Sequence, residues 1–117
     1  MHIVDSHCHV SPVWFEPVET LLFQMDRHGV AQAVLTQLLG QFDNTYQQRC
    51  VTSYPGRFAS IVAVDPAAAH ACGQLQRLAT EGASGVRLRP EMRSIGADPY
   101  NIWRTAAQML EHDRQVR

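Results

Sequence analysis

Short apolar runs alternate along the chain with longer stretches whose apolar residues recur at helical spacing. The runs cover residues 3–9, 31–38, 58–65 and 85–89, and each begins about 27 residues after the one before, close to the length of a strand–helix unit. Residues 18–28, 45–53 and 67–80 between the runs, and 101–113 after the last, have helical patterns. This order predicts an α/β domain whose strands are parallel and joined by helices.

Local signals mark the ends of the predicted helices. Gly29 directly follows the first helix, and glycine in that place commonly ends a helix in a left-handed conformation. Asn44 precedes the second helix, where asparagine is a favoured N-cap, and Pro55 with Gly56 stops it. The boundaries of these two helices are therefore well defined by the sequence.

Four such units fit two architectures. A doubly wound open sheet would be complete at this length, whereas a closed (β/α)8 barrel normally needs about 250 residues and eight units. No strand is followed by a glycine-rich phosphate loop, which disfavours a nucleotide-binding doubly wound domain. The periodicity alone leaves both architectures open.

Composition narrows the choice of partner. The 117 residues include 10 basic and 11 acidic side chains, a balance that gives no positive field for nucleic acid or anionic lipid. No apolar run approaches the roughly 20 residues that cross a bilayer, and the first residues do not form a secretory signal. Three cysteines at wide spacing, Cys8, Cys50 and Cys72, fit no disulfide framework. We expect a cytoplasmic protein that binds a small-molecule substrate and neither nucleic acid nor membrane.

The candidate chemistry lies in one segment, Asp5-Ser6-His7-Cys8-His9, at the carboxyl end of the first predicted strand. Because side chains alternate along a strand, His7 and His9 should share a face with Asp5, and Cys8 should point away. Parallel α/β folds place their active sites at this end. Two imidazoles there can hold one divalent metal, with Asp5 orienting a ring N–H from outside the ligand shell. A hydrogen-bonded histidine pair without metal is the simpler alternative.

Four stretches resemble one family. Residues 3–9, IVDSHCH, are similar to the D-x-H-x-H signature on the first strand of amidohydrolase-related proteins. YPGRF at 54–58 and VAVDP at 62–66 resemble the P-x-R-F and V-D-P pattern around the family's third strand, and GVRLR at 85–89 looks like its fourth strand. The resemblance runs in order through essentially the whole chain.

The resemblance implies that residues 1–117 are a single incomplete domain, the first four units, or half, of a (β/α)8 TIM barrel. It implies a metal-dependent hydrolase that acts on a small carbonyl substrate, such as a lactone, an amide or a related carboxylated compound; some relatives are decarboxylases. His7 and His9 would be metal ligands, with Zn²⁺ the expected ion, and a metal-held water the nucleophile, since zinc lowers the pKa of water to about 7.

The resemblance assigns no catalytic residue to this chain, because the family's remaining ligands and its catalytic aspartate lie on the fifth, sixth and eighth strands. We therefore expect a fragment, a truncated product, or two copies that self-associate to complete the barrel. Half a barrel would expose unpaired strand edges. The rival hypothesis is a non-catalytic remnant that binds metal or a protein partner.

Two arginines suggest how a substrate would be held. Arg87 and Arg89 alternate onto one face at the end of the fourth predicted strand, where guanidinium groups suit a substrate carboxylate. Ion pairing within the protein is the alternative role. The aromatic residues Trp14, Phe15 and Trp103 are expected to pack or to form pocket walls.

Overall fold

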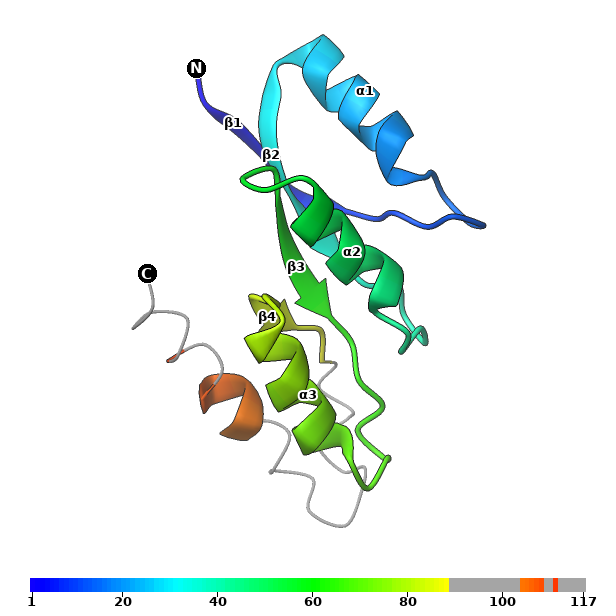
Figure 1. Ribbon diagram of the computed structural model, residues 1–117, viewed down its shortest axis with the longest axis vertical. Coiled ribbons are helices and arrows are strands. Elements are labelled where there is room, and N and C mark those ends of the chain that lie inside the picture. The colour runs from blue at the N-terminus through cyan, green and yellow to red at the C-terminus, as the bar shows by residue number, and fades with distance from the viewer. Residues whose placement is uncertain (89–103, 109–110, 112–117) are drawn as a thin grey trace.

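The computed structural model describes residues 1–88, 104–108 and 111, and it contains the predicted alternation of strands and helices. The four strands form one parallel sheet in the order β1-β2-β3-β4. Figure 1 shows the helices following one another along this sheet. In chain order the elements are β1 (Ile3–Cys8), α1 (Val18–His28), β2 (Val30–Thr36), α2 (Thr45–Ser53), β3 (Phe58–Val62), α3 (Ala71–Thr80) and β4 (Gly85–Val86).

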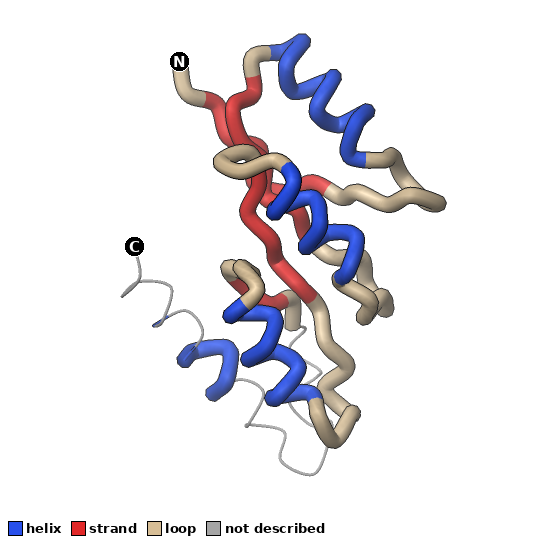
Figure 2. Tube along the Cα trace, viewed as in Figure 1, coloured by secondary structure: helices blue, strands red, loops and turns tan. Residues whose placement is uncertain are grey.

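The strand order bears on the two architectures that the sequence left open. Each strand lies beside the one that precedes it, so the described sheet winds in one direction and never reverses. Right-handed crossovers then place α1, α2 and α3 on the same face, and Figure 2 shows them on one side of the strands. A doubly wound sheet requires a reversal of strand order. The described sheet, from β1 to β4, therefore has no doubly wound arrangement.

The helix boundaries follow the local signals in two cases of three. The bounds of α1 and α2 are as predicted, and Gly29 is left-handed at φ 69°, with its N–H donating to the carbonyl oxygen of Met25. The third helix begins at Ala71, four residues later than predicted. The oxygens of Asp65 hold the preceding segment in a turn, since its Oδ1 accepts from the N–H of Ala67 and its backbone oxygen from that of Ala68.

The strand ends differ from the prediction where the site lies. β1 ends at Cys8, one residue before His9, and β3 ends at Val62. Asp5 pairs with Ala33 of β2 and Cys8 pairs with Leu35, so an advance of three residues along β1 corresponds to only two along β2. A bulge in β1 therefore interrupts the alternation of faces. Arg89 and most of the predicted last helix lie outside the described residues, although residues 104–108 and 111 are helical.

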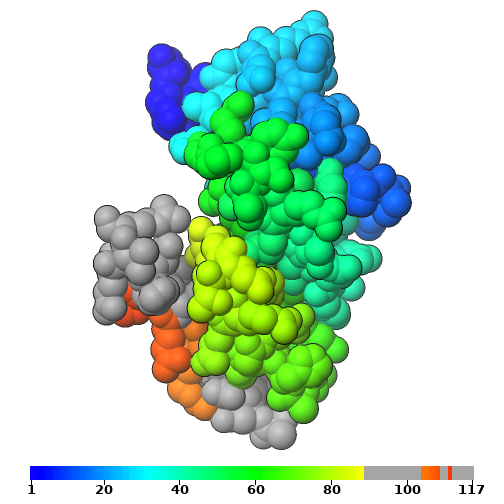
Figure 3. Space-filling model, viewed as in Figure 1, coloured from blue at the N-terminus to red at the C-terminus, as the bar shows by residue number. Residues whose placement is uncertain are grey.

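Two apolar clusters join the described sheet to its helices. Leu35 on β2 is fully buried among residues of α1 and α2, and Val62 on β3 is fully buried against α3, where Leu75 has no exposed surface. The outer strand β1 is the exception, because five of its six residues are exposed. In Figure 3 the start of the chain stands at the margin of the molecule. An exposed edge strand is the usual place for another strand to pair.

The cysteines and the helix lengths agree with the expectations from composition. Cys8, Cys50 and Cys72 are free, and burial raises the pKa of the Cys50 thiol. Across residues 1–88, 104–108 and 111, none of the helices has the length and apolar character to cross a bilayer.

Candidate metal site

The rings of His7 and His9 meet at the carboxyl end of β1, although a bulge interrupts the alternation there and His9 lies just beyond the strand. Their Nε2 atoms are 3.2 Å apart, and their rings lie edge to face with centroids separated by 4.8 Å. The His7 side chain is exposed and that of His9 is partly buried. The two imidazoles therefore present nitrogen atoms to the same point in space.

A backbone carbonyl fixes the orientation of His9. Its Nδ1 lies 2.7 Å from the carbonyl oxygen of Thr36, the last residue of β2. That oxygen can only accept, so Nδ1 carries the proton, and the lone pair of a neutral ring is left on Nε2. The pairing of β1 with β2 ends at Cys8 and Leu35. The carbonyl oxygen of Thr36 therefore has no strand partner on β1 and can accept from the His9 ring. Ligating histidines are commonly oriented in this way.

The pair fits a divalent metal in its donor set and its spacing. Two nitrogens at the usual zinc bond length of 2.0–2.1 Å in a tetrahedral shell lie about 3.3 Å apart, close to the separation of the two Nε2 atoms. The same separation fits a hydrogen bond from one ring to the other. Within the part of the chain that the structure describes, no third histidine, cysteine or carboxylate joins the cluster. Any further ligands must therefore lie outside these residues.

The sequence suggested that the Asp5 carboxylate accepts a hydrogen bond from a histidine ring N–H. In the structure it accepts from other groups. Its Oδ1 accepts from the backbone N–H of His7 at 3.0 Å, and its carboxylate also accepts from the thiol of Cys8. These two hydrogen bonds lower the pKa of Asp5, while burial and the neighbouring Asp5 raise the pKa of Cys8 to about 12. The bulge in β1 explains these partners, because it brings Asp5 and Cys8, which are three residues apart, to the same side of the strand.

Arg87 lies at the same end of the sheet, and its guanidinium is tied to the backbone. Its Nη1 donates to the carbonyl oxygen of Gln37 at 2.8 Å, reaching across β3 to the residue that follows β2. Its own N–H extends the pairing of β3 with β4 by donating to Val62. The companion residue Arg89 lies outside the described residues, so the paired arrangement stays a prediction.

Two aromatic side chains continue the site beyond the histidines. The ring centroids of Phe15 and His9 are 5.2 Å apart, and those of Trp14 and Phe15 are 5.1 Å apart. Both are more than half exposed, and Phe15 is held at φ 60°, a left-handed conformation that is rare for an aromatic residue. They stand as walls beside the histidines rather than in the core.

Comparison with known proteins bears on the fold. No family model and no curated protein matches the sequence. A crystal structure of a probable 2-pyrone-4,6-dicarboxylic acid hydrolase from Acinetobacter baumannii with citric acid bound is similar at a TM-score of 0.66 and 22% identity, over 96% of this chain and 46% of that chain. An apo structure from Agrobacterium tumefaciens is similar at a TM-score of 0.60 and 18% identity, over 95% of this chain and 44% of that chain. The chain thus spans less than half the length of these structures and shares their fold over nearly all of its own.

Proposed function

We propose that this chain forms the first half of an amidohydrolase-type (β/α)8 barrel and serves a metal-dependent hydrolase acting on a small carbonyl substrate. The observation that carries the proposal is the convergence of the two Nε2 atoms at the carboxyl end of β1, with His9 oriented by Thr36. The singly wound sheet and the fold shared with a probable hydrolase support it.

In this proposal His7 and His9 hold a divalent cation, with Zn²⁺ the expected ion. A bound cation would supply Lewis-acid activation of water beside the substrate carbonyl. The carbonyl of Thr36 keeps the His9 ring in one tautomer and one orientation. Arg87 would hold a substrate carboxylate at the same end of the sheet, in keeping with the dicarboxylic acid that the Acinetobacter protein's name gives as its substrate.

The rest of the barrel would pair with the edge of β1. Ile3 and Val4 on β1 are exposed apolar residues, at 39% and 47% exposure, and a further strand paired with this edge would cover them. That strand would come from the second half of a longer chain or from a second copy of this one. The free thiols are in keeping with a reducing compartment such as the cytoplasm.

Hydrolysis by the purified chain tests the proposal. The chain is loaded with Zn²⁺ and offered a panel of carboxylated lactones and amides, with product acid measured by titration. In chain whose barrel is completed by a second copy, we expect turnover that requires the metal, that disappears in a His7→Ala/His9→Ala double variant, and that persists in a His2→Ala control, because His2 bonds Gln32 at the far end of β1.

Two outcomes would contradict a hydrolase. Metal-loaded chain with a completed barrel that hydrolyses nothing in the panel would favour the non-catalytic remnant. Metal-dependent release of CO2 from the carboxylated members, without hydrolysis, would favour a decarboxylase. Turnover that survives in the double variant would exclude the histidine pair as its origin.

A further inference from the structure

An open groove of about 580 Å³ lies between α2 and α3. This volume falls in the range of about 300–1,000 Å³ that pockets for small molecules occupy. Phe42 and Leu78 give the groove an apolar part, on which a short aliphatic chain can lie. The other lining residues are polar or charged, and they come from the two helices and the loop before α2. The groove is therefore a second candidate site, apart from the histidine pair.

One buried acceptor between these two helices has no partner. Gln48 is only 8% exposed and reaches from α2 to Glu81, the residue after α3, where its Nε2 donates to the carbonyl oxygen. Because a carbonyl can only accept, the amide orientation is set and Oε1 is the remaining atom. Among residues 1–88, 104–108 and 111, nothing donates to this buried Oε1. An unpaired buried acceptor costs free energy that a donor on a ligand would recover.

The amide of Gln48 is held weakly, so it can turn toward the groove that Gln48 lines. The contact of its Nε2 with Glu81 is 3.4 Å long, beyond the usual N–H···O distance of about 2.7–3.2 Å. The last torsion of a glutamine side chain is also soft. A turn about this bond exchanges one long hydrogen bond for a shorter one from Oε1 to a donor in the groove.

The charge of the lining sets the class of donor. The groove carries two carboxylates, of Asp43 and Glu81, and one guanidinium, of Arg77. The Nε of Arg77 lies 4.0 Å from Oε1 of Glu81, so these two charges offset each other. Hydrogen bonds from Thr45 lower the pKa of Asp43, which is therefore ionised at neutral pH. Neither ion pair of the described residues includes Asp43, so its charge suits a cationic ligand.

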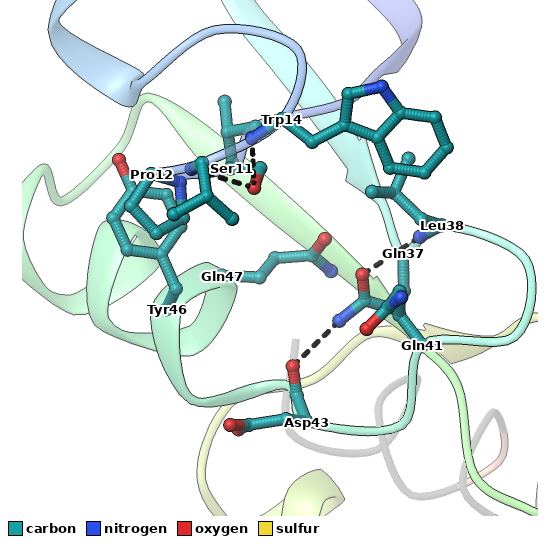
Figure 4. Close-up of a pocket in the computed structure, with 11 residues that line it drawn as sticks. Ser11, Pro12, Trp14, Gln37, Leu38, Gln41, Asp43, Tyr46 and Gln47 are labelled. Carbon is teal, nitrogen blue, oxygen red and sulfur yellow. Dashed lines mark hydrogen bonds between the residues drawn. The ribbon is translucent and has the colours of Figure 1, made fainter.

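The loop that carries Asp43 is fixed before any ligand arrives. The Nε2 of Gln37 donates to the backbone oxygen of Asp43 at 3.0 Å, and the side chain of Asn44 bonds both backbone groups of Ala63. Figure 4 shows the bond from Gln37, and the Asp43 side chain extends away from the neighbouring pocket that is drawn there. The carboxylate therefore stands on an anchored backbone.

We propose that this groove binds a small alkylguanidinium ion. One N–H of the guanidinium donates to Oε1 of Gln48 and another to the carboxylate of Asp43, while the alkyl chain lies on Phe42 and Leu78. A guanidinium suits these acceptors better than an ammonium, because its donors spread in one plane and its charge is more weakly hydrated. The site needs no metal and is independent of the proposed hydrolase site.

Titration of the full chain with three matched probes tests the groove. Butylguanidinium has the charge and the N–H donors, butylurea has a similar planar shape without the charge, and butyltrimethylammonium has the charge without the donors. In ¹H–¹⁵N NMR spectra, butylguanidinium should shift the side-chain amide of Gln48 and the backbone amides of Thr45 and Glu81. The other two probes should bind at least about tenfold more weakly, the value of a hydrogen bond to a charged group.

Matched variants assign the binding to two residues. Gln48→Met keeps a side chain of similar length without the acceptor, and it should weaken butylguanidinium at least about tenfold. Gln76→Met makes the same change at an exposed position of α3 and should leave the affinity unchanged. Asp43→Asn should weaken binding about twofold to fivefold, as the loss of an exposed ion pair does. Glu19→Gln removes an equal charge from α1 and should have no effect.

Several outcomes would overturn the proposal: equal binding of butylurea or butyltrimethylammonium, binding that survives in a Gln48→Met variant with an unchanged circular dichroism spectrum, saturable shifts confined to other residues, or no saturable binding of butylguanidinium. A blocked Gly-Arg-Gly peptide offers the same group as the side chain of another protein. Peptide binding more than about tenfold tighter would overturn the assignment to a small molecule. The His7→Ala/His9→Ala double variant should bind butylguanidinium as the unaltered chain does.

Discussion

Replacing His9 by alanine is expected to lower the affinity of the chain for Zn²⁺ about a hundredfold or more. The loss of a partner that merely orients a ligand already costs about 10–100-fold, and this change removes a ligand itself. His9 is also the ring that the structure holds most firmly, through the contact of Nδ1 with Thr36. Competition against a chromophoric chelator measures the affinity.

The matched control for that experiment is His2→Ala. His2 lies on the same segment, and its ring bonds the side chain of Gln32 at 3.0 Å, away from the site. Its loss should change Zn²⁺ affinity by less than about twofold. A His9→Ala variant that binds as tightly as the control would show that the 3.2 Å contact of the two rings is only a hydrogen bond between them.

Replacing Asn44 by alanine is expected to lower the free energy of unfolding by about 2–4 kcal/mol. Its side chain binds the residue that directly follows β3, since Nδ2 donates to the carbonyl oxygen of Ala63 at 2.8 Å and Oδ1 accepts from the same residue's N–H at 3.1 Å. Both backbone groups are buried, and each group left unpaired costs about 1–3 kcal/mol. Urea denaturation followed by circular dichroism measures the change.

Gln41→Ala is the control for Asn44, because Gln41 belongs to the same loop and is exposed. Its replacement should change the stability by less than about 0.5 kcal/mol, as surface substitutions do. Equal stability of the two variants would mean that the loop after β2 is not held to β3 through Asn44.

Much of the fold was predictable because its signals are local. Helices α1 and α2 were placed correctly, since Gly29 and the Pro55-Gly56 pair stop them within one residue of the predicted ends. The start of α3 was not, because the helical propensity of its alanines is overridden by the oxygens of Asp65. Asn44 occupies the predicted position before α2, but its side chain bonds Ala63, just after β3, instead of capping the helix.

The site was predictable only where its geometry depends on neighbours in sequence. A spacing of two along a strand predicted that His7 and His9 converge, and their rings do meet, although β1 bulges here and ends before His9. The position of Asp5 depends on a bulge that no local pattern marks. The oxygen of Thr36 comes from a distant segment, and it is a backbone atom that the sequence does not distinguish.

X-ray absorption at the zinc edge of the loaded chain tests the central claim most directly, because it counts imidazole ligands around the metal. The structure of the pair predicts at least two imidazole nitrogens at about 2.0–2.1 Å, with the outer-shell scattering of intact rings, and the loss of two in the His7→Ala/His9→Ala variant. A zinc shell without imidazole, or one that the double variant leaves unchanged, would contradict the claim that His7 and His9 form a metal site.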